Sequence, residues 1–183
     1  MNLFDSSLRY SSHREFIPLI VDRLGIKDMV EVGVLHGALS VAILDKCPQV
    51  RSYYLVDPWQ PFTDPPSYSQ EIWDRRYAAV ESKMEQYGNR VHVLRLTSLE
   101  AAKRLKPGSL DFVYIDGNHS FKYVDEDIKI WWSKVRSTGC LAGHDIKKPR
   151  WPGVLKAVEA NFGERYYCGQ PTGNWDGVWI VDK

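Results

Sequence analysis

The sequence has few cysteines, no long apolar run and no repeated unit. Its three cysteines include no CxxC pair, which indicates neither a disulfide framework nor a zinc ribbon. No segment approaches the ~18 consecutive apolar residues of a membrane span, and no basic stretch leads into an apolar run near the N-terminus. The missing repeat excludes solenoids and propellers. These absences predict a cytoplasmic protein that is neither secreted nor inserted in a membrane.

An excess of either charge is also missing. The 24 Lys and Arg residues against 23 Asp and Glu residues leave a formal charge of +1. No field of the whole chain therefore attracts nucleic acid or an acidic membrane, and we expect a small-molecule partner. The near-neutral surface also permits a homodimer without requiring one.

What is present is the composition of a folded domain. Hydrophobic residues make up 44% and charged residues 26% of the 183 positions, which is ordinary for a globular protein. The length predicts one domain over residues 1–183, with residues 1–25 as an N-terminal helical extension. The opening stretch 11–25 reads as a helix, although Pro18 inside it predicts a kink or a late start.

Short apolar runs alternate with amphipathic segments along the chain. Continuous apolar runs are typical of parallel strands that helices cover on both faces. The predicted strands are 28–33, 51–57, 91–96, 110–116, 139–145, 165–168 and 177–182. The predicted helices between them include 69–88, 98–105, 120–135 and 152–162, and Thr97 with Glu100 forms a capping box before the second of these. This order predicts a doubly wound α/β fold with a seven-stranded, mostly parallel sheet whose last strand is antiparallel.

Ligands of such sheets bind outside the carboxyl ends of the strands, and the first strand ends in EVGVLHG. Gly33 and Gly37 would let a ligand approach the backbone, but the loop matches neither GxGxxG nor GxxxxGK[ST]. Glu31 would repel phosphates and suits a ligand with a positive group. A plain strand-to-helix turn explains the same glycines. Asp57, at the end of the second strand, can accept hydrogen bonds from both hydroxyls of a ribose, which favours an adenosyl ligand.

Several motifs together resemble the class I S-adenosylmethionine-dependent methyltransferases, in particular methyltransferase family 24. They are EVGVLHG, YYLVDPW, LDFVYIDGNHSFKYVDEDIKIWW, TGCLAGHD, GVLKAVEANF and DGVWIVDK, within residues 12–183. The resemblance implies a Rossmann-like methyltransferase that uses S-adenosylmethionine. It places the methionyl part at Glu31, Gly33 and Gly37 and the ribose at Asp57. It also assigns Ser98 to the adenine and Asp116 to the cofactor site, although helix capping explains Ser98 equally well.

The fourth and fifth strands end in the residues that would carry the chemistry. Adjacent strand ends bring Asp116 close to Asp145, and two such carboxylates repel unless a cation or a proton lies between them. Mg²⁺ would suit these oxygens, and His144 would also suit Mn²⁺, Fe²⁺ or Zn²⁺, or would only orient Asp145. We therefore predict a divalent-metal site at Asp116, His144 and Asp145.

The spacing of Asp116 and His119 is similar to that of metal-dependent O-methyltransferases of the catechol and macrolide-sugar types, which implies His119 as the base. A neutral imidazole with a pKa of about 6.5 can take a hydroxyl proton. His119 also fits a simple turn. His144 departs from the acidic or amide residue usual in those families. His13 and His92 read as structural.

Two other segments fit the same cleft. Residues 58–70 hold four prolines and form either a surface connector or a lid over the substrate. The run KKPRW, residues 147–151, is either a solvated surface or a site for an anionic acceptor. Trp59, Trp151 and Trp175 would line the cleft.

Together these patterns predict methyl transfer from S-adenosylmethionine to a hydroxyl of a small molecule such as a sugar or a phenol. A metal-free or nitrogen-directed methyltransferase is the first alternative. The second is a noncatalytic cofactor-binding or scaffold domain. A DNA amino-methyltransferase is disfavoured, because the segment after the fourth strand reads IDGNH instead of the (Asp or Asn)-Pro-Pro-aromatic motif.

Overall fold

Six helices and nine strands are found in the computed structural model, which describes residues 9–62, 68–171 and 177–183. The helices are α1 (His13–Arg23), α2 (Ala38–Lys46), α3 (Gln70–Met84), α4 (Ser98–Arg104), α5 (Phe121–Trp132) and α6 (Pro152–Phe162). A 3-10 segment, η1 (Glu85–Arg90), follows α3. The strands of the main sheet are β2 (Asp28–Val32), β3 (Ser52–Val56), β4 (Val91–Leu94), β5 (Leu110–Ile115), β6 (Val135–Gly143), β7 (Tyr167–Cys168) and β9 (Trp179–Asp182). None of the described helices is both long and apolar enough to cross a membrane.

The main sheet confirms the predicted fold class. Its strand order is β4-β3-β2-β5-β6-β9-β7. Neighbouring strands are parallel except that β9 runs antiparallel to β6 and to β7. A separate parallel pair joins β1 (Arg9–Tyr10) to β8 (Gln170–Pro171). The chain reverses its direction of winding between β2 and β5, so the carboxyl ends of these two strands are where a ligand is expected.

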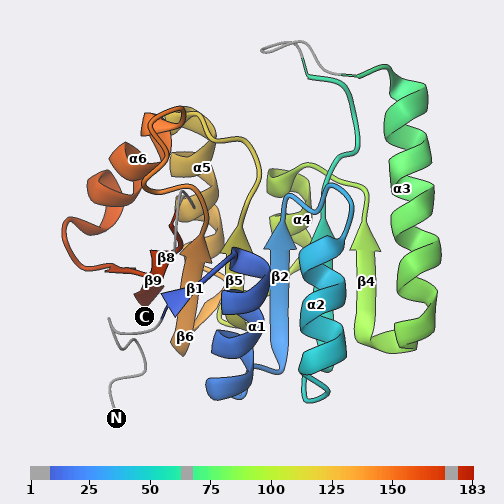
Figure 1. Ribbon diagram of the computed structural model, residues 1–183, viewed down its shortest axis with the longest axis horizontal. Helices are drawn as coiled ribbons and strands as arrows, with labels where there is room; N and C mark the ends of the chain where they lie inside the picture. The colour runs from blue at the N-terminus through green and yellow to red at the C-terminus, as the bar shows by residue number, and fades with distance from the viewer. Residues whose placement is uncertain (1–8, 63–67, 172–176) are drawn as a thin grey trace.

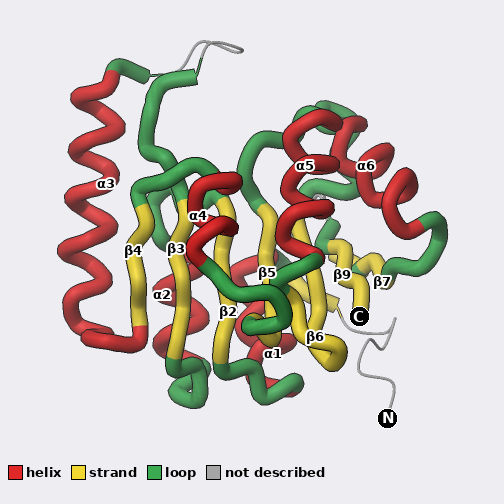
Figure 2. Tube along the Cα trace, turned by 180° about the vertical axis from the view of Figure 1, so that it is seen from behind, coloured by secondary structure: helices red, strands yellow, loops and turns green. Residues whose placement is uncertain are grey.

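Helices cover both faces of the sheet. Figure 1 shows α1, α2 and α3 on the near side, and Figure 2 shows α4, α5 and α6 on the opposite side. An apolar core fills each face. All five residues of β2 are buried, as expected for a strand that is covered on both sides. The alternating apolar runs of the sequence therefore correspond to a three-layer sandwich.

Helix boundaries follow the local chemistry. Thr97 caps α4 and forms the predicted capping box with Glu100. Gly37, with a φ of 70°, precedes α2, and Pro152 lies in the first turn of α6. The helix α1 begins before Pro18 and continues through it, so the proline costs only the hydrogen bond to the carbonyl group of Arg14.

Two features of the sheet differ from the sequence-based expectation. β6 begins at Val135 instead of residue 139, because its polar start contains Arg136, which pairs with carboxylates of the neighbouring strands. The pair β1 and β8 was not predicted, since two residues are too few to show a periodicity. Neither difference changes the order of the central strands.

An ion-pair network ties the amino ends of four strands together. Arg136 pairs with Asp28 and Asp111, and Arg51 also pairs with Asp28, with a distance of 2.8 Å between Nη2 and Oδ2. Asp111 accepts hydrogen bonds from the backbone amides of Lys27 and Asp28, each at 2.9 Å. Arg51 is the largest cause of a lowered pKa at Asp28, about 2. These contacts fix the sheet at the edge opposite the candidate site.

Candidate active site

The loop between β2 and α2 approaches the end of β5 very closely. Gly33 has a φ of 93°, and a Cβ atom there would lie 2.2 Å from the carbonyl oxygen of Asp116. Only glycine has both the backbone freedom and the small volume for this position. The structure thus brings the predicted glycine loop next to Asp116, which was predicted as a metal ligand and a residue of the cofactor site.

Asp57 holds the glycine loop from the neighbouring strand. Its Oδ2 atom accepts hydrogen bonds from the backbone amides of Val34 and Leu35, both at 3.0 Å. Its Oδ1 atom accepts one from the amide of Trp59 at 2.8 Å. The carboxylate therefore braces the loop in this structure, and its predicted contact with a ribose stays a prediction.

Glu31 lies beneath the loop, inside the apolar core. Its side chain is 2% exposed, and Oε2 accepts hydrogen bonds from the hydroxyls of Ser40 at 2.7 Å and Tyr53 at 2.6 Å. Burial is the main cause that raises the pKa of Glu31 to about 8. The carboxyl group points toward α2 and β3, so its predicted proximity to the methionyl group is not tested here.

Ser98 takes part in a buried polar contact between α4 and α5. Its hydroxyl donates a hydrogen bond to Asp127 and accepts one from the indole nitrogen of Trp131 at 2.7 Å. Burial raises the pKa of Asp127 to about 6. The structural role is evident, whereas the predicted role near the adenine stays a prediction.

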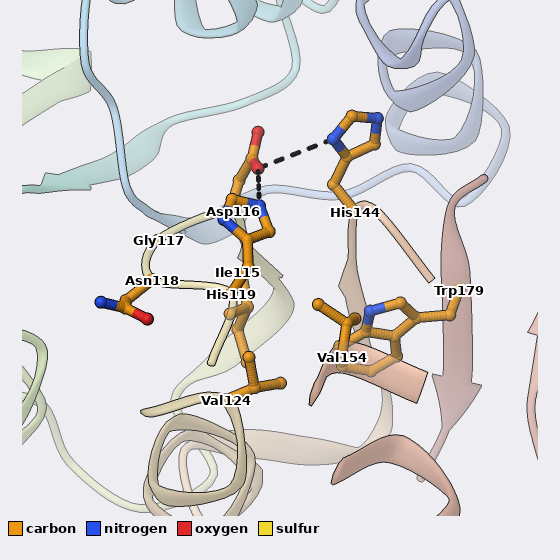
Figure 3. Close-up of a pocket in the computed structure, with 9 residues that line it drawn as sticks. All are labelled: Ile115, Asp116, Gly117, Asn118, His119, Val124, His144, Val154 and Trp179. Atoms are coloured by element: carbon orange, nitrogen blue, oxygen red, sulfur yellow. Dashed lines mark ion pairs between the residues drawn. The ribbon is translucent and has the colours of Figure 1, made fainter. Parts of the chain in front are cut away.

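Four polar side chains meet at the carboxyl ends of β5 and β6. Asp116 and His119 follow β5, and His144 and Asp145 follow β6. Nε2 of His119 lies 2.8 Å from Oδ2 of Asp145 and 3.6 Å from Oδ1 of Asp116. Nδ1 of His144 lies 3.1 Å from Oδ1 of Asp145 and 3.7 Å from Oδ1 of Asp116. Figure 3 shows both imidazoles directed toward Asp116. We call these four residues the acid–imidazole cluster.

The charges in this cluster compensate one another. Burial raises the pKa of Asp116, but His119 and His144 outweigh it and lower this pKa to about 2. Burial lowers the pKa of His119, but Asp116 and Asp145 outweigh it and raise this pKa to about 9. At neutral pH the imidazole of His119 therefore carries a proton in this arrangement. This differs from the ordinary value of about 6.5 on which the sequence argument relied.

Two further rings lie against the cluster: sequence reasoning missed that of His13, whereas it placed Trp151 in the cleft. The ring of His13 in α1 lies 4.4 Å from that of His144, and burial is the main cause that lowers the pKa of His13 to about 4. The indole of Trp151 stacks on His119 with 5.1 Å between ring centroids. No spacing rule links a residue of the first helix to the end of β6, so His13 had no signal in the sequence.

Of the other two tryptophans predicted to line the cleft, Trp59 lies in the core instead and Trp175 is not described. Trp59 is fully buried, and its indole nitrogen donates a hydrogen bond to the carbonyl oxygen of Leu35 at 3.1 Å, so it supports the glycine loop from within the core. Trp175 lies outside the described residues. The same is true of residues 63–67 in the predicted lid, which stays a prediction.

The predicted metal ligands have the right chemistry but pair with one another. Within the described residues, no group of three or more His, Cys, Asp or Glu side chains is arranged to hold a metal ion. Among these residues, Nε2 of His119 and Oδ1 of Asp145 are buried and make no well-directed hydrogen bond, despite their short distances to charged neighbours. The carboxylates of Asp116 and Asp145 and the imidazole of His144 are side chains of the types that bind divalent cations.

The cavity directly below the cluster is too small for an organic ligand. Its volume is about 10 Å³, and Ile115, Val124, Val154 and Trp179 form its apolar part (Figure 3). This is room for about one water molecule. A nucleoside must therefore bind outside it.

These observations define a class of protein. A mostly parallel sheet of this strand order, a glycine loop after its first strand, an acidic residue after the next strand and acidic residues at two further strand ends are the features of class I S-adenosylmethionine-dependent methyltransferases. Residues 30–146 match the family model of a methyltransferase domain, methyltransferase family 24. The chain belongs to this family.

Comparisons with known proteins give a sequence relative and solved structures of the same fold. A protein of Sinorhizobium fredii, called uncharacterized protein y4gI, is 27% identical over 152 residues, which are 80% of this chain and 16% of that protein. The chain thus spans about a sixth of the length of this curated relative. The O-methyltransferase of Bacillus cereus in complex with S-adenosylhomocysteine has a TM-score of 0.70 at 15% identity, with 100% of this chain and 85% of that chain covered. The methyltransferase PaMTH1 of Podospora anserina, bound to S-adenosylhomocysteine, has a TM-score of 0.68 at 15% identity, with 92% and 76% covered.

Proposed function

We propose that this methyltransferase transfers the methyl group of S-adenosylmethionine to a hydroxyl of a small molecule. The acid–imidazole cluster at the ends of β5 and β6 is the observation that carries this proposal. It lies against the glycine loop, since Gly33 contacts the backbone of Asp116. A cofactor on that loop would present its methyl group to the cluster. The name of the Bacillus cereus neighbour supports transfer to oxygen.

The cofactor would lie along the carboxyl edge of the sheet. Gly33 and Gly37 leave room for its methionyl part, and Asp57 stands where a ribose would bind. Glu31 would act from beneath the loop, because its carboxyl group is buried between Ser40 and Tyr53. In the same proposal Ser98 and Asp116 would lie near the adenine and the sulfur, respectively.

His119 would take the proton of the acceptor hydroxyl. Its imidazole is held by Asp145 and covered by the indole of Trp151. Because Asp116 and Asp145 raise the pKa of His119 to about 9, its imidazole is protonated at neutral pH. It must therefore release this proton to solvent before it can act as a base. General base catalysis of this kind contributes about 10²–10⁴ in rate. Holding the acceptor in line with the sulfonium would contribute the larger share.

Asp116, His144 and Asp145 would hold a divalent cation. A cation at these residues would supply positive charge that lowers the pKa of a bound hydroxyl. The cluster also supports a second candidate, a metal-free methyltransferase, because an imidazole nitrogen already lies against each of the two carboxylates. Removal of metal by EDTA distinguishes the two. Turnover that EDTA abolishes and Mg²⁺ or Mn²⁺ restores supports the cation, and full turnover in EDTA supports the metal-free enzyme.

The small-molecule acceptor and the cytoplasmic location belong to the same proposal. Cys47, Cys140 and Cys168 are all free thiols, which is usual in a reducing compartment. The formal charge of +1 supports a small acceptor over nucleic acid.

The test is methyl transfer from labelled S-adenosylmethionine to a panel of phenols, catechols and sugars. We expect His119→Ala to lower turnover at least about 100-fold while the Kd for S-adenosylmethionine changes less than about threefold. His92→Ala is the matched control, because His92 lies in β4 and stacks on Tyr54. Equal turnover in wild type and His119→Ala would exclude the base. Cofactor binding without transfer to any hydroxyl would favour a noncatalytic or nitrogen-directed protein.

A further inference from the structure

A second and larger cavity opens beside the acid–imidazole cluster. Its volume is about 530 Å³, within the range of small-molecule pockets. One wall is the segment that follows β6, a second is α6 between residues 152 and 159, and Tyr166 and Cys168 complete the lining. In Figure 1, α6 lies above β9, near the edge of the sheet that ends in β7.

The charged side chains around this cavity are mainly cationic. Lys147, Lys148 and Lys156 line it, against a single acidic residue, Glu159, among its described walls. The first residue of α6, Pro152, is also part of the wall. The N-terminal end of an 11-residue helix carries a partial positive charge that adds to that of the lysines. The cavity therefore favours a negatively charged occupant.

The cavity adjoins the cluster. Lys148 lines the cavity, and its Nζ atom lies 3.6 Å from Oδ1 of Asp145. Trp151, which stacks on His119, directly precedes Pro152 of the cavity wall. One molecule can thus place its reacting end at His119 and its other end between Lys147 and Lys156.

We propose that this cavity binds the anionic group, a phosphate or a carboxylate, of the methyl acceptor. The inference rests on the proposed function, because the acceptor's hydroxyl would lie at His119. Lys147 and Lys156 are exposed at the cavity, and charge-assisted hydrogen bonds from them would hold the anion. Lys148 would connect the two halves of the site through its ion pair with Asp145.

The experiment compares matched pairs of hydroxyl compounds by isothermal titration calorimetry. The pairs are glucose 6-phosphate with glucose, and 3,4-dihydroxybenzoate with 3,4-dihydroxybenzyl alcohol, with inorganic pyrophosphate as a probe that has no hydroxyl acceptor group. We expect the anionic member of at least one pair, and pyrophosphate, to bind at least about tenfold more tightly than neutral compounds. This preference should weaken as the salt concentration rises. The phosphate and carboxylate pairs show which anion the cavity accepts.

The charge-reversal variant Lys147→Glu/Lys156→Glu should lose the preference. The matched control is Lys103→Glu/Lys106→Glu, which changes the net charge equally at exposed positions around the end of α4. Thermal melting confirms that both variants fold. Equal binding of charged and neutral compounds, or a preference that survives in Lys147→Glu/Lys156→Glu, would overturn the inference.

The two proposals fail in different ways. Methyl transfer to hydroxyls without any preference for anionic acceptors would leave the proposed function intact and overturn the anion site. Anion binding that depends on Lys147 and Lys156, in a protein that transfers no methyl group to a hydroxyl, would support the anion site and overturn the proposed function.

Discussion

The buried carboxyl group of Glu31 makes a prediction about stability that can be worked out from the structure. Its side chain is 2% exposed, and burial raises its pKa from 4.5 to about 8. Below pH 4.5 the group is protonated in both the folded and the unfolded chain. Between pH 4.5 and 8 the unfolded chain releases a proton that the folded chain keeps, so the free energy of unfolding falls as the pH rises.

The size of this effect follows from the two pKa values. At about 1.4 kcal/mol for each pH unit, the difference between 4.5 and about 8 corresponds to about 5 kcal/mol. The variant Glu31→Gln keeps the shape of the side chain and cannot ionise. Relative to wild type, we expect it to gain about 5 kcal/mol of stability between pH 4.5 and pH 8, and to gain little more above that.

Urea unfolding followed by tryptophan fluorescence at several pH values measures this difference. The control is Glu164→Gln, because Glu164 is exposed, and its relative stability should stay within about 0.5 kcal/mol over the same range. If Glu31→Gln and wild type keep a constant difference from pH 4.5 to pH 8, the buried carboxyl group does not titrate as argued and the reasoning is wrong.

Three further substitutions test the framework of the site. Arg136→Ala should cost about 1–3 kcal/mol in urea unfolding, because it leaves two aspartates at the amino edge of the sheet without their shared cation. Gly143→Ala should cost about 1–3 kcal/mol or prevent folding, since the new Cβ would lie 2.6 Å from ring atoms of Trp179. Gly33→Ala should lower the affinity for S-adenosylmethionine at least about tenfold in equilibrium dialysis, because its Cβ would displace the backbone of Asp116.

Two control variants accompany these three substitutions. Arg165→Ala removes an exposed arginine and should change stability by less than about 0.5 kcal/mol. Gly108→Ala introduces a Cβ where nothing lies within 4 Å at a φ of 62°, so it should cost only the backbone term of about 1 kcal/mol. A Gly143→Ala variant no less stable than Gly108→Ala, or unchanged cofactor affinity in Gly33→Ala, would contradict the packing described here.

The sequence predicted the sheet well because its strands are covered on both faces. The continuous apolar runs at β2 and β5 indicate buried parallel strands. The capping box at Thr97 and Glu100 marks the start of α4. The start of β6 was missed because Arg136 and its polar neighbours are stabilised by ion pairs with distant strands, which leave no local pattern.

The candidate site was predictable only as a set of residues at one edge of the sheet. Adjacent strand ends bring Asp116 and Asp145 together, as expected from parallel topology. The turn after β6 was not predictable, and there Asp145 adopts a φ of 58°. Successive residues of a strand point to opposite faces, so this turn is what lets His144 and Asp145 reach the same cluster. The contact of His13 with this cluster depends on tertiary packing alone.

A crystal structure of the protein with S-adenosylhomocysteine tests the central claim most directly. The account predicts the nucleoside at the carboxyl edge of the sheet, with its ribose against Asp57, its sulfur beside Asp116 and the open side of the sulfur facing His119. Density for the nucleoside away from the glycine loop, or a sulfur separated from His119 by the body of the protein, would contradict it.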